Sequence, residues 1–165
     1  MTVVADILAT WRNPSAVLRD KLAGPPREDR ALAVLAGACL LIFVAELPGL
    51  ARAAHLDPSV PLEARIGGAL LATLFVLPLV LYALAGASHL VLRLLGRAGS
   101  AYGSRVALFW SLLCIGPMML VQGLLAGLVG PGWVSGLSGF AVLLAFVALW
   151  RAGLAVVRET GMQNV

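Results

Sequence analysis

The feature that most constrains this chain is a run of 45 residues, 106–150, that contains no Asp, Glu, Lys, Arg or His. An α-helix rises about 1.5 Å per residue, so about 20 apolar residues cross a hydrocarbon core of about 30 Å. The run is too long for one crossing, and Gly130-Pro131-Gly132 near its middle is typical of a tight turn. We therefore predict two membrane-spanning helices here, over 106–129 and 133–156.

Two earlier stretches are equally apolar. The stretch 31–51 is apolar except for Glu46, and no Asp, Glu, Lys or Arg occurs between Arg65 and Arg93. These stretches predict spanning helices over 31–51 and 66–95. The spanning bundle is therefore expected within 31–157.

The composition agrees with this interpretation. Hydrophobic residues make up 61% of the 165 residues and charged residues 12%, whereas roughly a quarter of the residues of soluble domains are charged. The predicted fold class is an all-α integral membrane protein with about four transmembrane helices and an N-terminal amphipathic surface helix. The net charge of +4 is scattered at the edges of apolar blocks, which indicates membrane topology and not nucleic-acid binding.

The first thirty residues predict a cytoplasmic or interfacial segment. Asn13-Pro14 is a helix start signal, with Asn as the N-cap and proline at the first helical position. The following stretch, 14–23, has apolar residues on one side and charged residues on the other, which favours a short helix on the bilayer surface. A solvated tail is the alternative. Charged residues interrupt the segment, so no cleavable signal peptide is expected.

The distribution of Arg and Lys predicts the orientation. Cytoplasmic loops carry an excess of these residues. With a cytoplasmic N-terminus, ten fall on the cytoplasmic side and two, Arg52 and Arg65, on the other. We therefore expect the N-terminus and the tail 158–165 both in the cytoplasm. Eleven Arg against one Lys, in a chain dominated by Ala, Leu and Gly, is typical of a GC-rich bacterial genome, so a multi-pass protein of the bacterial cytoplasmic (inner) membrane is expected.

Prolines and glycines indicate how the helices bend and pack. Pro78 and Pro117 predict helix bends, because proline removes a backbone hydrogen bond. Gly123 and Gly127 are four residues apart, a spacing that lets two membrane helices approach closely. We expect this pair to pack within the chain and not at a dimer interface.

Polar residues within the apolar blocks predict two layers. The outer layer contains Glu46, Gln122 and either Arg52 or Arg65, with a Glu–Arg pair as its physical basis. The alternative is a carboxylate that reaches water among the lipid headgroups.

The inner layer contains His89, Trp110, Ser111 and Arg105, next to a basic turn predicted over 96–104. Its alternative is a set of ordinary interfacial anchors.

His89 and Glu46 are expected at opposite interfaces, so the sequence predicts no metal site. It also contains no pairing of a nucleophile with a base, no paired carboxylates and no phosphate-binding loop, so we expect neither a catalytic residue nor a cofactor. Cys39 and Cys114 lie in apolar runs and are expected to pack as small hydrophobic residues.

Several short motifs resemble the Yip1 family of multi-spanning membrane proteins. They are Asn13-Pro14, His89-Leu90, the stretch Leu94-Leu95-Gly96-Arg97-Ala98-Gly99-Ser100, and Gly116-Pro117. The similarity covers roughly 12–155 and corresponds to a short, four-helix bacterial form. It implies a helical bundle with a cytoplasmic N-terminus, and eukaryotic members are associated with small-GTPase binding. We do not expect a small GTPase here, because the chain lacks the long N-terminal segment of those members.

Together these observations favour a non-enzymatic membrane protein that acts through helix–helix packing with other membrane proteins, as a scaffold or accessory subunit, or in membrane organisation. Its expected partners are the lipid bilayer and one or more membrane proteins. The alternative is a small transporter or channel component, with Pro78 and Pro117 as hinges and with Glu46 and Gln122 lining a path.

Overall fold

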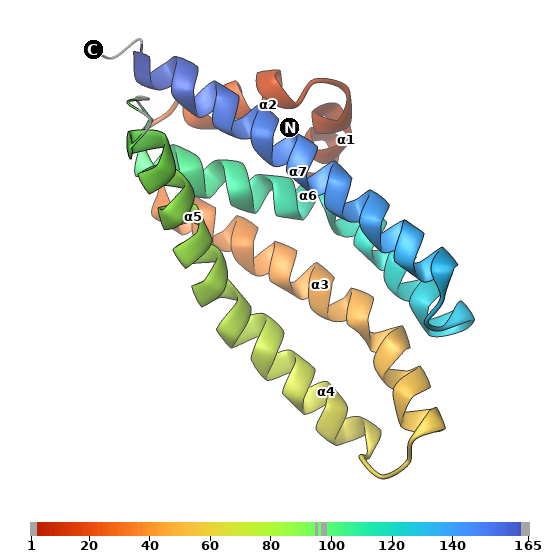
Figure 1. The fold of residues 1–165 in the computed structure, drawn as a ribbon. Helices are drawn as coiled ribbons and strands as arrows, with labels where there is room; N and C mark the ends of the chain where they lie inside the picture. The colour runs from red at the N-terminus through yellow and green to blue at the C-terminus, as the bar shows by residue number, and fades with distance from the viewer. Residues whose placement is uncertain (1–2, 95, 97–98, 163–165) are drawn as a thin grey trace.

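The structure is a computed structural model that describes residues 3–94, 96 and 99–162. These residues form helices joined by short turns, and no strand occurs among them. The helices are α1 (Val3–Arg12), α2 (Pro14–Leu22), α3 (Glu28–Leu56), α4 (Leu62–Leu71), the π-helix η1 (Ala72–Val76), α5 (Leu77–Leu94), α6 (Ala101–Val129) and α7 (Trp133–Met162) (Figure 1).

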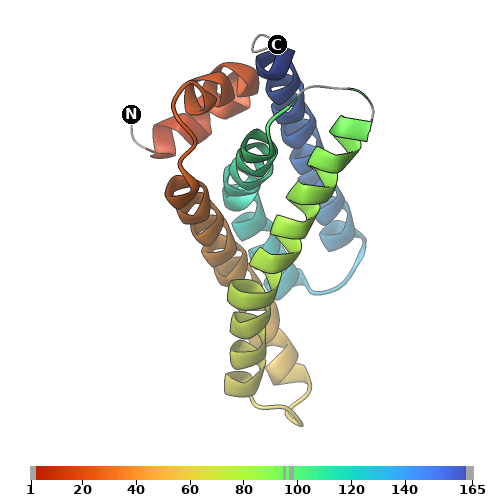
Figure 2. The ribbon, with the colours of Figure 1, turned by 90° about the vertical axis from the view of Figure 1, so that its left-hand side faces the viewer.

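Four helical stretches are long and apolar enough to cross a membrane: α3, the continuous α4–η1–α5, α6 and α7. This confirms the predicted fold class, an all-α multi-pass membrane protein. In Figures 1 and 2 the chain folds back and forth, with the turn after α3 at one end and both described termini at the other.

The spanning helices extend beyond their predicted bounds. The helix α3 covers 28–56 instead of 31–51, and α4 begins at Leu62 instead of 66. The helix α6 begins at Ala101 instead of 106, because the Ser100 side chain accepts a 2.9 Å hydrogen bond from the backbone N–H of Gly103 and caps it. The predicted turn over 96–104 is therefore shorter, and residues 97–98 within it lie outside the described residues. The helix α7 continues to Met162, where a tail had been expected from 158.

The backbone accommodates Pro78 and Pro117 in different ways. Before Pro78 the backbone forms the π-helix η1, in which the N–H of Leu77 bonds to the carbonyl of Ala72, five residues back. Such π-turns occur where the regular hydrogen-bond ladder is interrupted, as proline interrupts it here. Pro117 lies inside α6, and Figure 1 shows α6 changing direction near its middle.

The first half of α6 forms the centre of the bundle. Between Gly103 and Gly116 every residue except Arg105 is buried. The helices α3, α5 and α7 pack against α6, and α1 and α2 reach its first half as well. Beyond Pro117 the helix becomes partly exposed, so the core lies toward the end of the bundle that carries the two short helices (Figure 2).

Candidate functional site

The N-terminal segment folds back onto the bundle as two helices. Asn13 caps α2 as expected, because its side-chain oxygen accepts a 3.1 Å hydrogen bond from the N–H of Ala16. The interpretation as a single surface helix was incomplete, since 3–12 also form a helix, and both helices pack on the bundle: α1 on α6, and α2 on α7 and α6. The buried side chains Thr10 and Leu18 mark the packed faces of α1 and α2.

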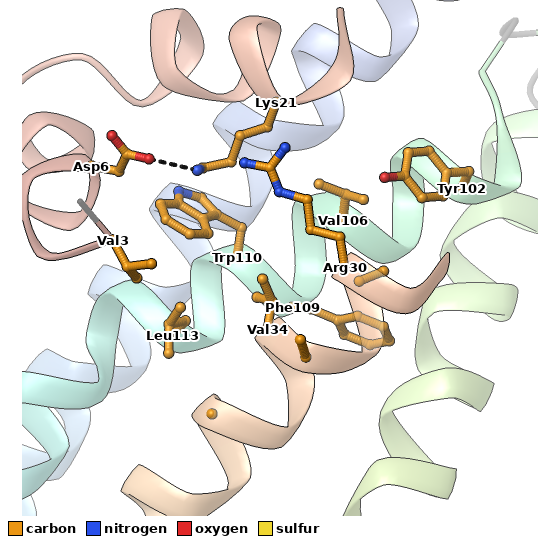
Figure 3. Close-up of a pocket in the computed structure, with 13 residues that line it drawn as sticks. Val3, Asp6, Lys21, Arg30, Val34, Tyr102, Val106, Phe109, Trp110 and Leu113 are labelled. Carbon is orange, nitrogen blue, oxygen red and sulfur yellow. Dashed lines mark hydrogen bonds and ion pairs between the residues drawn. The ribbon is translucent and has the colours of Figure 1, made fainter. Parts of the chain in front are cut away.

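A polar cluster fastens α1 and α2 to α6. The Lys21 ammonium nitrogen lies 2.8 Å from a carboxylate oxygen of Asp6 and 3.7 Å from the centre of the Trp110 ring. The Trp110 indole N–H donates a 3.1 Å hydrogen bond to the Thr10 hydroxyl. These groups lie together in Figure 3. The hydrogen bond from Lys21 holds the pKa of the Asp6 carboxyl below its ordinary value.

In this cluster Trp110, which was predicted in the inner polar layer with a membrane-interface anchor as the alternative, contacts Lys21 and Thr10. Its side chain is covered by the two N-terminal helices and is 3% exposed. Asp6, Thr10 and Lys21 were not among the site residues predicted from the sequence. Asp6 and Thr10 are four residues apart, a spacing that places two polar side chains on one face of a helix and could have indicated a polar contact there.

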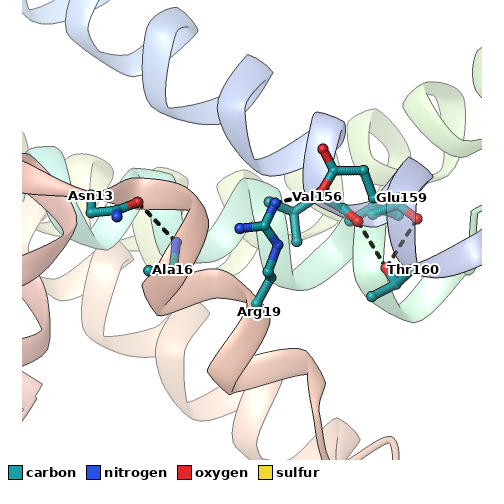
Figure 4. A network of polar contacts seen from close by, with 7 residues as sticks. Asn13, Ala16, Arg19, Val156, Glu159 and Thr160 are labelled. Carbon is teal, nitrogen blue, oxygen red and sulfur yellow. Dashed lines mark hydrogen bonds and ion pairs between the residues drawn. The ribbon is translucent and has the colours of Figure 1, made fainter.

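A second contact joins α2 to the end of α7. A guanidinium nitrogen of Arg19 lies 2.5 Å from a carboxylate oxygen of Glu159, and both side chains are about half exposed (Figure 4). Exposed pairs of this kind contribute about 0–1 kcal/mol, so the Asp6–Lys21–Trp110 cluster is expected to dominate the docking of the N-terminal helices.

The other residues of the predicted inner layer do not form one site. Arg105 pairs with the Glu28 carboxylate and so joins α6 to α3. The Ser111 hydroxyl donates to the carbonyl of Ala107, one turn back on its own helix. Among the described residues nothing accepts from or donates to the buried ring nitrogen Nδ1 of His89 on α5.

The outer layer is partly assembled. Glu46 and Gln122 line the same groove between α3 and α6, of about 370 Å³. The Thr73 hydroxyl, in η1, approaches a carboxylate oxygen of Glu46 at 3.5 Å, which is long for such a hydrogen bond. Thr73 was not among the predicted site residues, although it is the one Ser or Thr between 66 and 87.

Neither arginine of the outer layer pairs with Glu46. Arg52 donates to the carbonyls of Gly127 and Leu128, at 3.3 and 3.2 Å, and thereby caps the end of α6. Arg65 bonds to the carboxylate and carbonyl of Asp57 in the turn after α3. Six residues of helix place Arg52 about 240° around α3 from Glu46, so a pair within the helix cannot form.

Gly123 and Gly127 lie where α6 crosses α3. A Cβ atom built on Gly123 would stand 1.8 Å from the carbonyl oxygen of Ala45, and one built on Gly127 would stand 2.5 Å from Cβ of Pro48. The pair therefore packs within the chain, and only glycine permits this helix crossing.

A second pocket, of about 340 Å³, lies where α1 and α2 meet α3 and α6. Charged groups of Asp6, Lys21 and Arg30 stand at one part of it, and apolar side chains of α3 and α6 form the rest (Figure 3). Among the described residues no three His, Cys, Asp or Glu side chains come together as metal ligands would.

Comparison with known proteins adds no relative. No protein-family model matches the chain, and no curated protein or solved structure is significantly similar to it.

Proposed function

We propose that this chain is a non-enzymatic, Yip1-type protein of the bacterial inner membrane. It acts through helix–helix packing with other membrane proteins, as a scaffold or accessory subunit of a membrane complex, or in membrane organisation. Its N-terminus and C-terminus face the cytoplasm. The Yip1 assignment and this role rest on the sequence motifs and on the features described next.

The observation that carries the proposal is the position of Glu46. It lies within the apolar part of α3 and is exposed on the surface of the protein. Among the described residues no Lys, Arg or His comes within 4 Å of its carboxylate, and Thr73 is its one hydrogen-bond partner. Because α3 (Glu28–Leu56) extends beyond its predicted end, Glu46 lies about 6 Å from the middle of the helix, closer to the middle than the interface position expected from the sequence. A carboxyl group at such a depth in a spanning helix is costly unless it is paired. A partner helix that offers a donor or a cation would satisfy it.

The groove beside Glu46 supports the same proposal. Small residues line much of it, including Ala45 and Gly49 of α3 and Gly123 and Ala126 of α6. Membrane helices associate by close packing against small residues and by hydrogen bonds between helices, since lipid supplies no hydrophobic driving force. A groove of about 370 Å³ has room for a large side chain of a neighbouring helix.

The charge distribution supports the orientation. One end of the bundle carries Glu28–Arg30, Arg93, Arg105 and Arg158, together with the two N-terminal helices, and the other end carries the turn after α3 and Gly130–Gly132. An excess of Arg and Lys is typical of cytoplasmic loops. The end with the N-terminal helices is therefore assigned to the cytoplasm.

Photocrosslinking in native membranes tests the proposal. A photoreactive phenylalanine at Leu50, which lines the groove, is expected to form a discrete adduct with a second membrane protein. The same residue at Leu144, exposed on α7, is the matched control and is expected to react with lipid alone. Glu46→Leu should lower the Leu50 adduct about fivefold, as for the loss of one hydrogen bond between membrane helices. An absent adduct, or one with the same yield in Glu46→Leu, would contradict the proposal.

A second candidate function follows from the π-helix η1. A π-turn next to Glu46 places non-standard backbone beside a polar side chain, an arrangement found at functional sites and favourable to a transport path. Ion or solute flux in proteoliposomes separates the two functions. If Glu46→Gln left every measured flux unchanged, the transport function would lose its support.

A further inference from the structure

The pocket under the N-terminal helices holds an excess of positive charge. Lys21 and Arg30 both line it, and Asp6 is its one carboxylate. Asp6 is already paired with Lys21 at 2.8 Å, whereas Arg30 has no carboxylate within 4 Å among the described residues. In Figure 3 the Arg30 guanidinium extends toward Lys21 above the Trp110 ring. The pocket therefore carries one cation more than it can neutralise.

The rest of the pocket is apolar and runs into the membrane. Val34 and Gly37 follow Arg30 along α3, so Gly37 lies about 10 Å deeper than Arg30. Leu113 of α6 forms the facing wall, and a Cβ atom on Gly37 would stand 3.6 Å from its Cδ1 atom. Glycine at this position leaves the lower part of the pocket open.

We propose that this pocket binds an anionic phospholipid of the leaflet at the arginine-rich end. The lipid phosphate lies against Arg30 and Lys21, and one acyl chain follows Val34, Gly37 and Leu113. A ligand with a negative head and an apolar tail matches both parts of the pocket, whereas a soluble anion leaves the apolar wall unused. A volume of about 340 Å³ is also too small for a helix of a partner protein.

The first test measures which lipid stays bound. The full chain is reconstituted in nanodiscs that contain equal amounts of phosphatidylglycerol and phosphatidylcholine. The protein is then released from the nanodiscs in the mass spectrometer, and the lipid molecules that stay bound to it are counted by native mass spectrometry. Wild type should retain phosphatidylglycerol in preference. Arg30→Gln should lower that retention about fivefold, as for one basic residue close to an anionic headgroup. Arg93→Gln, an exposed arginine at the same end but outside the pocket, should leave it unchanged.

A second variant separates a lipid from a free anion. Gly37→Leu keeps every charge and fills the apolar part. Its Cβ atom would make an ordinary contact with the Leu113 side chain, and circular dichroism of the purified variant checks that the bundle folds. It should lower phosphatidylglycerol retention, while millimolar inorganic phosphate should not displace the lipid. Equal retention of both lipids by wild type, or equal losses in Arg30→Gln and Arg93→Gln, would overturn the proposal. Displacement by phosphate with no effect of Gly37→Leu would identify a small-anion site and would overturn it as well.

Discussion

Gly123→Ala is expected to lower the free energy of unfolding by about 3 kcal/mol, at the upper end of the range for overpacked cores. The added methyl group would stand 1.8 Å from the carbonyl oxygen of Ala45 and 2.7 Å from its carbonyl carbon. These are backbone atoms, so no side-chain rotation relieves the clash, and α3 and α6 must separate where they cross. Thermal unfolding in detergent, followed by tryptophan fluorescence, measures the change.

Gly136→Ala is the matched control for this prediction. Gly136 lies in α7 at the same end of the bundle, and a Cβ atom there meets nothing within 4 Å. Alanine is the better helix former, so this variant should be as stable as wild type or slightly more stable. If Gly123→Ala unfolded at the same temperature as Gly136→Ala, α3 and α6 would not cross as closely as the structure shows.

Lys21→Met is expected to release the N-terminal helices from the bundle. The Lys21 side chain is 8% exposed and the Asp6 side chain is 17% exposed. The substitution therefore leaves a largely buried carboxylate without its cationic partner, and it removes the cation from the face of the Trp110 ring. Breaking a buried pair in this way costs about 3 kcal/mol. Hydrogen exchange of the backbone amides in 3–22 should become about a hundredfold faster, and mass spectrometry measures it.

Two further variants test whether the faster exchange comes from an unpaired buried charge or from any loss of a charged side chain in α2. Arg19→Met removes a cation from the same helix, but its pair with Glu159 is about half exposed, so the effect should stay below about 1 kcal/mol. The double variant Asp6→Leu/Lys21→Met removes both buried charges and should recover most of the protection. If Lys21→Met and Arg19→Met exchanged at the same rate, the cluster would not hold the N-terminal helices.

The same cluster gives the docking a pH dependence. Lys21 lowers the pKa of Asp6 in the folded protein, chiefly through its hydrogen bond. Arg30, on α3, lowers the same pKa by a smaller amount. The ionised carboxylate therefore stabilises docking above the unfolded-state pKa, and this stabilisation is lost as pH falls below the ordinary value of 3.8 and through the lowered value. The protection factors of the backbone amides in 3–22, which correct for the slower intrinsic exchange in acid, should fall in wild type as the pH is lowered and should not fall in the double variant.

Features with a local physical cause could be predicted from the sequence. The four spanning helices follow from apolar runs of sufficient length, and the start of α2 follows from Asn13-Pro14. The spacing of Gly123 and Gly127 indicated a close helix crossing, and the structure adds its partner, α3. Each of these features depends on residues that are near one another in the chain.

Features that depend on distant residues could not be predicted. Lys21 contacts Trp110 across 89 positions, and neither residue on its own indicates a buried cluster. Arg52 or Arg65 was predicted to pair with Glu46, but Arg52 donates to the carbonyls of Gly127 and Leu128 at the end of another helix, α6. Thr73, which approaches Glu46, lies in the π-helix η1, and the sequence offers only Pro78, five residues further along, as a sign of an irregular helix here.

The proposed arrangement, four crossings with both termini in the cytoplasm, is the premise shared by the proposed partner groove and the proposed lipid pocket. Single-cysteine labelling tests it directly, in a background where the buried Cys39 and Cys114 are replaced by alanine. Ser59→Cys, in the turn after α3, should react with a membrane-impermeant maleimide in intact spheroplasts. Ala23→Cys, after α2, should react only once the membrane is permeabilised. Labelling of Ala23→Cys in intact spheroplasts, or protection of Ser59→Cys there, would contradict the arrangement.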